Sequence, residues 1–118
     1  MPYLFTYFTE ERTGGEQVYF SVSNDGLRWQ DLSQHPALTW PHGDGGVRDP
    51  YIVRHPQTGT YFVMATDLCI KRREYKWEDA VHAGSRDVVL WSSKDLINWS
   101  GPWPVTIAPE GAGCAWAP

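Results

Sequence analysis

The feature that most constrains the fold is an internal repeat. The segment "VYFSVSNDGLRW" at 18–29 aligns with "VVLWSSKDLINW" at 88–99, an offset of 70 residues, and each copy is an apolar run followed by Ser-x-Asp-x-x-x-Trp. A second alignment, of "GDGGVRDP" at 43–50 with "GAGCAWAP" at 111–118, has an offset of 68. A period of this length that contains about four strands predicts β-propeller blades with long loops rather than a helical solenoid.

The rest of the chain also predicts an all-β fold. Aromatic and β-branched residues are concentrated in short runs that glycine, proline or charged clusters separate, as expected of strands. Only residues 73–84 have a pattern that allows a short helix, so there is no room for βαβ crossovers. The predicted strands cover 3–9, 16–23, 50–55, 60–68, 86–93 and an outermost segment at 97–108.

The repeated Ser-x-Asp-x-x-x-Trp unit is interpreted as blade architecture. Ser23 and Asp25, like their counterparts in the second copy, are expected to accept hydrogen bonds from backbone donors across the turn between two strands. Trp29 and Trp99 are expected to begin the outer strands and to be buried in equivalent places between neighbouring blades.

Counting strands from inner to outer divides the 118 residues into three parts of one partial propeller domain. Residues 1–40 form a partial blade with strands 2 to 4, residues 41–108 a complete four-stranded antiparallel blade, and residues 109–118 the approach to the next inner strand. The chain is therefore predicted to hold seven strands of an incomplete ring.

Charge and hydropathy exclude several classes of partner. Ten basic and fourteen acidic residues give a formal net charge of −4 with no basic run, which argues against nucleic acid and anionic membranes as partners. No apolar run is long enough for a membrane span, and Met1 to Thr9 lack the pattern of a secretory signal. The location is unknown from these data, with a cytoplasmic one as the default, and the sequence is equally consistent with a piece of a longer protein.

Metal and cofactor sites are not predicted. Cys69 and Cys114 fit neither a zinc pattern nor a disulfide framework, and the four histidines are scattered singly. Seven tryptophans in so short a chain exceed the needs of a small core, and a tryptophan can also offer a flat apolar face to a ligand.

The ordered set of motifs resembles a known family. The succession "YLFTYFT", "EQVYFSVSNDGLRW", "GVRDPYIVR", "YFVMATDL", "SSKDLINW" and "APEGAGCAWAP" is similar to the amino-terminal part of glycoside hydrolase family 43, the five-bladed propellers that include arabinofuranosidases and xylosidases. The resemblance implies an inverting glycosidase whose central funnel holds three carboxylates: an aspartate base, an aspartate that tunes pKa, and a glutamate acid.

Only the first of these carboxylates is matched within the chain. Asp49 in "VRDPYIV" corresponds to the inner-strand Asp-Pro of the family and is the candidate general base. Taken alone, Asp-Pro after glycines is more often a turn former than a chemical group. The resemblance puts the other two carboxylates beyond Pro118, and Glu110, in a loop, is not assigned to either role.

The same end of the blades is expected to supply the sugar-binding residues. Strand directions bring loops 39–46, 66–85 and 108–117 to the end where Asp49 lies. Each candidate has a plain alternative, either loop packing for the aromatics or ordinary turn chemistry, and Arg48 can either favour the charged form of Asp49 or point away from it. The candidate substrate-binding residues are Arg48, Asp67, Trp40, Trp77 and Trp116.

Three functional classes follow from these observations. The first is the amino-terminal portion of a glycoside hydrolase that acts on side chains of plant-type polysaccharides and is inactive without its missing blades. The second is a carbohydrate-binding module without turnover, and the third is a self-assembling propeller fragment. In each case open blade edges predict a homo-oligomer. The sugar specificity and the choice between exo and endo action depend on loops outside the chain.

Overall fold

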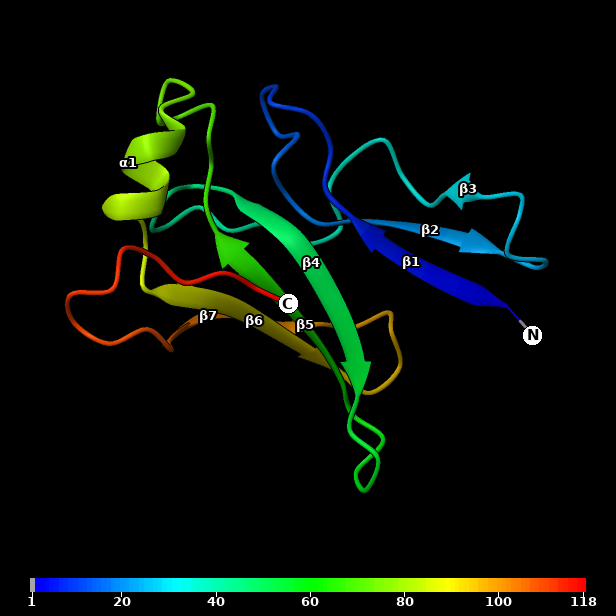
Figure 1. Ribbon diagram of the computed structural model, residues 1–118. Coiled ribbons are helices and arrows are strands. Elements are labelled where there is room, and N and C mark those ends of the chain that lie inside the picture. The colour runs from blue at the N-terminus through cyan, green and yellow to red at the C-terminus, as the bar shows by residue number, and fades with distance from the viewer. Residues whose placement is uncertain (1) are drawn as a thin grey trace.

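A computed structural model describes residues 2–118, and these residues form two antiparallel sheets (Figure 1). The first sheet has the order β1-β2-β3 and the second the order β4-β5-β6-β7. The strands are β1 (Tyr3–Tyr7), β2 (Tyr19–Ser23), β3 (Gln30–Asp31), β4 (Val47–Arg54), β5 (Tyr61–Asp67), β6 (Asp87–Ser93) and β7 (Ser100–Thr106), and a short helix, α1, spans Trp77–His82. The all-β prediction is confirmed, as are the seven strands and the short helix within 73–84. The two sheets do not close into a ring, which is consistent with a partial propeller.

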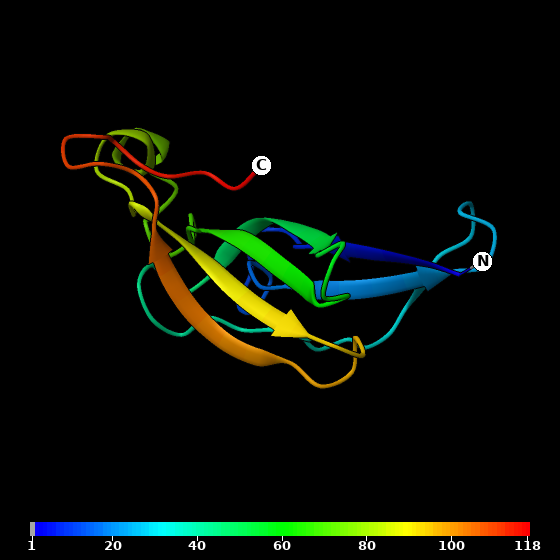
Figure 2. The same cartoon turned by 90° about the horizontal axis from the view of Figure 1, so that it is seen from below.

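The two sheets share one register, as the repeat predicts. In the first sheet Tyr3 pairs with Ser23, and in the second Tyr61 pairs with Ser93, the counterpart of Ser23. Figure 2 shows β4, β5, β6 and β7 side by side in that order. In both sheets the strand that ends at this serine, β2 in the first and β6 in the second, has a neighbouring strand on each side.

The repeated turns are built alike. Ser23 Oγ accepts a hydrogen bond from the backbone N–H of Gly26 at 2.8 Å, and Asp25 Oδ1 accepts from Leu27 and Arg28 at 2.9 and 2.8 Å. The second turn repeats these bonds within 0.1 Å, with Ser93 and Asp95 as acceptors and Leu96, Ile97 and Asn98 as donors. The predicted role of the serine and aspartate is therefore confirmed.

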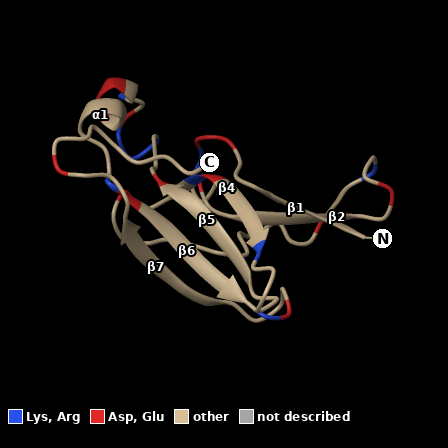
Figure 3. Ribbon diagram, turned by 60° about the horizontal axis from the view of Figure 1, so that its bottom comes forward, with Lys and Arg blue, Asp and Glu red and all other residues tan. Residues whose placement is uncertain are grey.

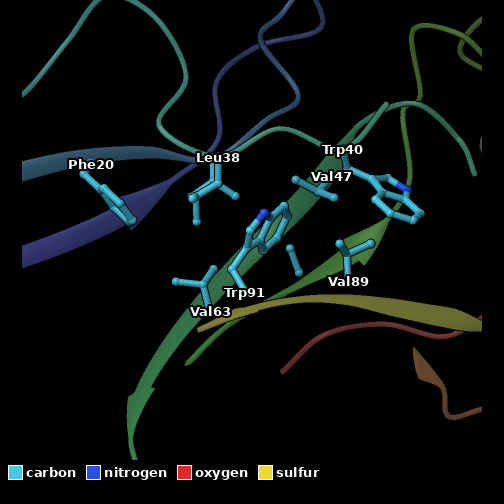
Figure 4. Packing of buried hydrophobic residues seen from close by; sticks show 9 residues of the cluster. Phe20, Leu38, Trp40, Val47, Val63, Val89 and Trp91 are labelled. Carbon is cyan, nitrogen blue, oxygen red and sulfur yellow. The ribbon is translucent and has the colours of Figure 1, made fainter. Parts of the chain in front are cut away.

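One face of each sheet meets the other in a shared core. Val18, Phe20 and Leu38 from the first unit pack with Val63, Val89 and Trp91 from the second, together with Ala65, Trp40 and Val47 (Figure 4). Trp99 packs against this cluster, and its ring lies 5.6 Å from that of Phe20. The prediction that Trp99 lies between two blade-like units is confirmed.

The equivalent burial predicted for Trp29 is wrong. Trp29 is 44% exposed and contacts Phe5 of its own sheet, at a centroid distance of 5.5 Å. It lies on the face of the first sheet that nothing covers in the described chain. A groove of about 360 Å³ runs along this face, lined by Phe5, Tyr7, Ser21, Trp29 and Asp31.

The opposite face of the second sheet is also uncovered. Tyr51, Val53, Trp103 and Val105 are exposed on β4 and β7. Charged side chains gather mainly in the loops and on α1 rather than on the strands (Figure 3). No helix within residues 2–118 is long and apolar enough to cross a membrane.

Candidate functional site

Asp49 lies in a β-bulge on β4. Arg48 pairs with Thr66 and Tyr51 with Met64, so Asp49 and Pro50 together oppose a single residue of β5. Asp49 has φ of 51°, in the left-handed region, where side chains other than glycine are uncommon and cost of order 1–3 kcal/mol. Its side chain is exposed. Bulges of this kind re-aim a side chain, and here the bulge turns a carboxylate into solvent at the beginning of an inner strand.

Pro50 fits the bulge because it has no N–H to contribute to the strand ladder. Its carbonyl oxygen instead accepts a hydrogen bond from Thr6 Oγ1 of β1 at 3.2 Å. The position of Asp49 is thus fixed from both sheets.

Arg48 points away from Asp49 toward two glutamates. Its Nη1 donates to Glu16 Oε1 at 2.7 Å and to Glu11 Oε1 at 3.1 Å. The guanidinium also lies over the rings of Phe8 and Trp77, at 4.5 and 5.0 Å from their centroids. Its observed partners are therefore protein groups, and its role in binding sugar stays a prediction.

Glu16 is the residue of this region that the sequence did not reveal. Its side chain is 2% exposed, yet both carboxylate oxygens are satisfied. Oε1 accepts from Arg48 and from the backbone N–H of Ile70 at 2.7 Å, and Oε2 accepts from Lys71 N at 3.1 Å and from the Cys69 thiol at 3.2 Å. Burial raises the pKa of that thiol, so Cys69 is a neutral donor. Nothing local in "TGGEQV" distinguishes this glutamate from a solvated loop residue.

The main chain of Glu16 also bonds to the first residue of β4, the strand that carries Asp49. The backbone N–H of Val47 donates to the carbonyl of Glu16 at 2.8 Å. One residue of the first unit therefore fixes both Val47 and Arg48, the two residues that precede the bulge. This is a structural connection between the units at the end where Asp49 lies.

Asp67 and Trp40 form a buried pair rather than an open sugar platform. Trp40 is 4% exposed and its indole N–H donates to Asp67 Oδ1 at 2.9 Å. Asp67 is 5% exposed and also accepts from the backbone N–H of Asp44 at 2.9 Å. The ring of Trp40 packs in the core cluster and has little exposed surface, and its role in binding sugar stays a prediction.

Asp44 completes this network on the solvent side. Its carboxylate accepts from Arg73 Nε at 2.5 Å and Nη2 at 2.7 Å, a bidentate pair, and from the backbone N–H of Cys69 at 3.2 Å. The pair raises the pKa of Arg73. Asp44, Asp67 and Glu16 are thus all engaged in holding loops, and none of them faces solvent as freely as Asp49.

Of the three candidate tryptophans, Trp77 and Trp116 are exposed, at 44% and 42%. Trp77 opens α1 and stacks with Arg48, which is adjacent to Asp49 in the chain. The segment that carries Trp116 is tied to β5, because Ala117 N donates to Thr66 Oγ1 at 2.8 Å. Since Thr66 pairs with Arg48, both aromatics belong to the region around the bulge.

The described residues contain no cluster of three or more histidine, cysteine or acidic side chains arranged to hold a metal ion. Around the bulge the structure has an exposed carboxylate, that of Asp49, and the exposed rings of Trp77 and Trp116, and a positioned carboxylate can act as a general acid or base.

Comparison with known proteins finds a family and a relative for the chain. A family described as "Probable glycosyl hydrolase domain", related to family 43, matches residues 1–118. An alpha-L-arabinofuranosidase of Bifidobacterium longum subsp. longum is 30% identical over an alignment of 124 residues, which covers 98% of this chain. The chain spans about 12% of the length of that relative. No solved structure matches the chain significantly.

Proposed function

The chain belongs to the glycosyl hydrolase 43-related family, and from that premise we propose that it is part of an inverting glycoside hydrolase of the arabinofuranosidase and xylosidase type, with Asp49 as the general base. The observation that carries the proposal is the left-handed bulge that exposes Asp49 at the beginning of β4. A strained carboxylate with no structural partner among the described residues is the kind of group that a functional site retains.

In this mechanism Asp49 removes a proton from a water molecule on one face of the sugar ring. A second carboxyl group protonates the leaving oxygen on the other face, and in inverting enzymes the two lie about 6.5–9.5 Å apart. The attacking water adds opposite the leaving group, so the anomeric configuration inverts. Trp77 and Trp116 supply apolar faces for the sugar, and Asp67 acts indirectly by holding Trp40 and the loop of Asp44.

We assign the general acid and the pKa-tuning aspartate to further blades of a longer protein. Support comes from the short span of the chain relative to the arabinofuranosidase, and from the structural engagement of Glu16, Asp44 and Asp67. The 118-residue chain alone is then expected to lack turnover. The division into a partial blade at 1–40, a blade at 41–108 and an approach to the next blade at 109–118 belongs to the same proposal.

The test is Asp49→Asn in a protein that joins this chain to the remaining blades. Removal of a general base should lower kcat by about 10² to 10⁴ on aryl arabinosides or xylosides. The fold should be kept, since asparagine also tolerates a positive φ. Asp25→Asn, a change of an exposed aspartate in the turn between β2 and β3, is the matched control. Full activity in Asp49→Asn would return Asp49 to the role of turn former.

The alternative function is binding of carbohydrate without turnover, or assembly as a scaffold. The uncovered faces of the two sheets favour association, since each presents exposed apolar side chains. A second copy of the chain is the proposed partner in the isolated state. Sedimentation at micromolar concentration should show an oligomer, and a stable monomer would contradict this part of the proposal.

A further inference from the structure

The loop end that carries Asp49 also contains a cavity of about 310 Å³ that none of the five candidate substrate-binding residues lines. It lies between the loop joining β1 to β2 and the segment that follows β5. Three cationic side chains line it, those of Arg12, Lys71 and Arg72. Three cations around one cavity are unusual in a chain of net charge −4.

Two of these cations have no acidic partner. Among residues 2–118, neither Lys71 nor Arg72 forms an ion pair. Arg12 has a distant one, with 3.7 Å between its Nε and Glu10 Oε1, in an exposed pair that contributes little. The cavity therefore keeps most of its positive charge.

The only acidic residue that lines the cavity does not cancel this charge. Glu16 is buried, and its carboxylate already accepts hydrogen bonds from Arg48, from two backbone N–H groups and from the Cys69 thiol. The walls of the cavity are already formed. Lys71 Nζ donates to Thr13 Oγ1 at 2.9 Å across the two loops.

Arg72 lies close to the backbone of Gly45 at the cavity wall. Gly45 has φ of 81°, and a Cβ at this position would collide with Arg72 Nη1. The absence of a side chain at Gly45 thus leaves room for the guanidinium. Guanidinium groups bind carboxylates well because they can donate two parallel hydrogen bonds.

From these observations we propose that the cavity binds the carboxylate of an acidic sugar unit, with Arg72 and Lys71 as its principal ligands and Arg12 as a supporting charge. The volume is at the lower end of the range for small-molecule sites, about 300–1,000 Å³, which fits one monosaccharide. The sugar part of this inference rests on the proposed function, whereas the carboxylate part rests on the cavity alone. The site would select glycans with acidic substituents near the bond that is cleaved.

The experiment is a titration of the 118-residue chain with galacturonate, galactose and inorganic phosphate, followed by the backbone amide NMR signals of Gly14, Gly45, Lys71 and Arg72. We expect galacturonate to shift these signals, and galactose, which lacks the carboxylate, to leave them unchanged. Binding should weaken with added salt, because it is electrostatic. Equal binding of galactose would overturn the carboxylate assignment, and tighter binding of phosphate than of galacturonate would overturn the sugar assignment.

Variants test the two ligands. Arg72→Gln and Lys71→Gln should each weaken galacturonate binding about tenfold or more, as loss of a charge-assisted hydrogen bond does. Both side chains are exposed, so the fold should be unaffected. Arg28→Gln, which removes an exposed arginine in the turn before β3, is the matched control and should leave binding unchanged. Unchanged binding in Arg72→Gln would overturn the proposal. This result is independent of hydrolysis, so failure of the Asp49 assignment and failure of the acidic-sugar site are separately visible.

Discussion

The two repeated units have the same turns and the same strand register. They differ in what covers the equivalent face of each sheet. In the second unit Trp91 is 2% exposed and fills the contact with the first sheet. Its counterpart in the first unit is Ser21, which lines an open groove beside Trp29. Local sequence thus specifies the strand and the turn in each unit, whereas the burial of a face depends on the neighbour that packs against it.

The two units also differ in the inner strand. The second sheet has β4, whose bulge carries Asp49, and the three-stranded first sheet has no equivalent within residues 2–118. The proposed general base therefore belongs to the second unit, and Glu16 of the first unit bonds to the two residues that precede its bulge. Each prediction below asks whether this difference between the units is real.

The largest effect on stability should come from Trp91→Ala. Removal of this buried side chain should cost about 3–5 kcal/mol in the free energy of unfolding, measured by urea denaturation. Ser21→Ala at the equivalent position removes only the hydrogen bond to Asp31 and should cost about 0.5–1.5 kcal/mol. Similar losses in the two variants would contradict the difference in packing between the two faces.

Glu16→Gln should be the next most damaging change, because it replaces the buried charged partner of Arg48 with a neutral amide and leaves only the more exposed Glu11 as an acidic partner. The expected loss in the free energy of unfolding is about 3 kcal/mol. Glu10→Gln is the matched control, since its pair with Arg12 is exposed and should contribute about 0–1 kcal/mol. Equal effects of the two substitutions would show that Glu16 does not connect the units.

Acid should weaken both turns, and the second more than the first. Backbone donors lower the pKa of Asp25 and of Asp95, and in the second turn the side chain of Asn98 donates as well. A carboxyl whose pKa is lower in the folded state adds stability above its unfolded pKa, and this contribution is lost as the pH falls through the folded pKa. The stability of Asp95→Ala should therefore fall less than that of the unaltered chain between about pH 5 and pH 2.

The matched variant is Asp25→Ala, which should show the same trend to a smaller degree. Denaturation curves recorded at successive pH values give the comparison. A pH dependence that is identical in both variants and in the unaltered chain would remove the turns as its source.

The smallest expected effect on stability is at the turn position that Gly26 occupies in the first unit and Leu96 in the second. Gly26 has φ of 76° and its counterpart Leu96 has φ of 65°, so only the first turn has the residue that this conformation favours. Leu96→Gly relieves a left-handed leucine, worth about 1–2 kcal/mol, but adds freedom to the unfolded chain, worth about 0.5–1 kcal/mol. A net stabilisation below about 1 kcal/mol is expected in thermal unfolding. Gly26→Leu should destabilise, since the left-handed backbone is strained for leucine, while its Cβ would only come into ordinary contact with the ring of Tyr3.

The sequence predicts those parts of the fold that repeat. The strands, the shared register, the serine and aspartate of each turn, and Trp99 between the units all follow from residues 18–29 and 88–99. Local patterns carry this information because each turn satisfies its own backbone donors. The exposure of Trp29 does not follow, because it depends on what lies beyond its sheet.

The site is predicted less completely, and for the same reason. Trp77 and Trp116 are exposed, and the roles predicted for them and for Asp49 in binding and cleaving sugar stay predictions. The burial of Trp40 and the role of Glu16 arise from contacts between residues 23 or more positions apart, which no local pattern encodes. The left-handed conformation of Asp49 is likewise visible only in the structure.

The central claim is that Asp49 activates the attacking water, and chemical rescue tests it most directly. In a protein that joins this chain to the remaining blades, Asp49→Ala should lose hydrolysis but regain turnover when azide is added, because azide attacks without a base and alanine leaves it room. The product should be a glycosyl azide of inverted configuration, identified by NMR of the reaction mixture. Full hydrolysis by Asp49→Ala without azide, or a product of retained configuration, would contradict the assignment of Asp49 as the base of an inverting glycosidase.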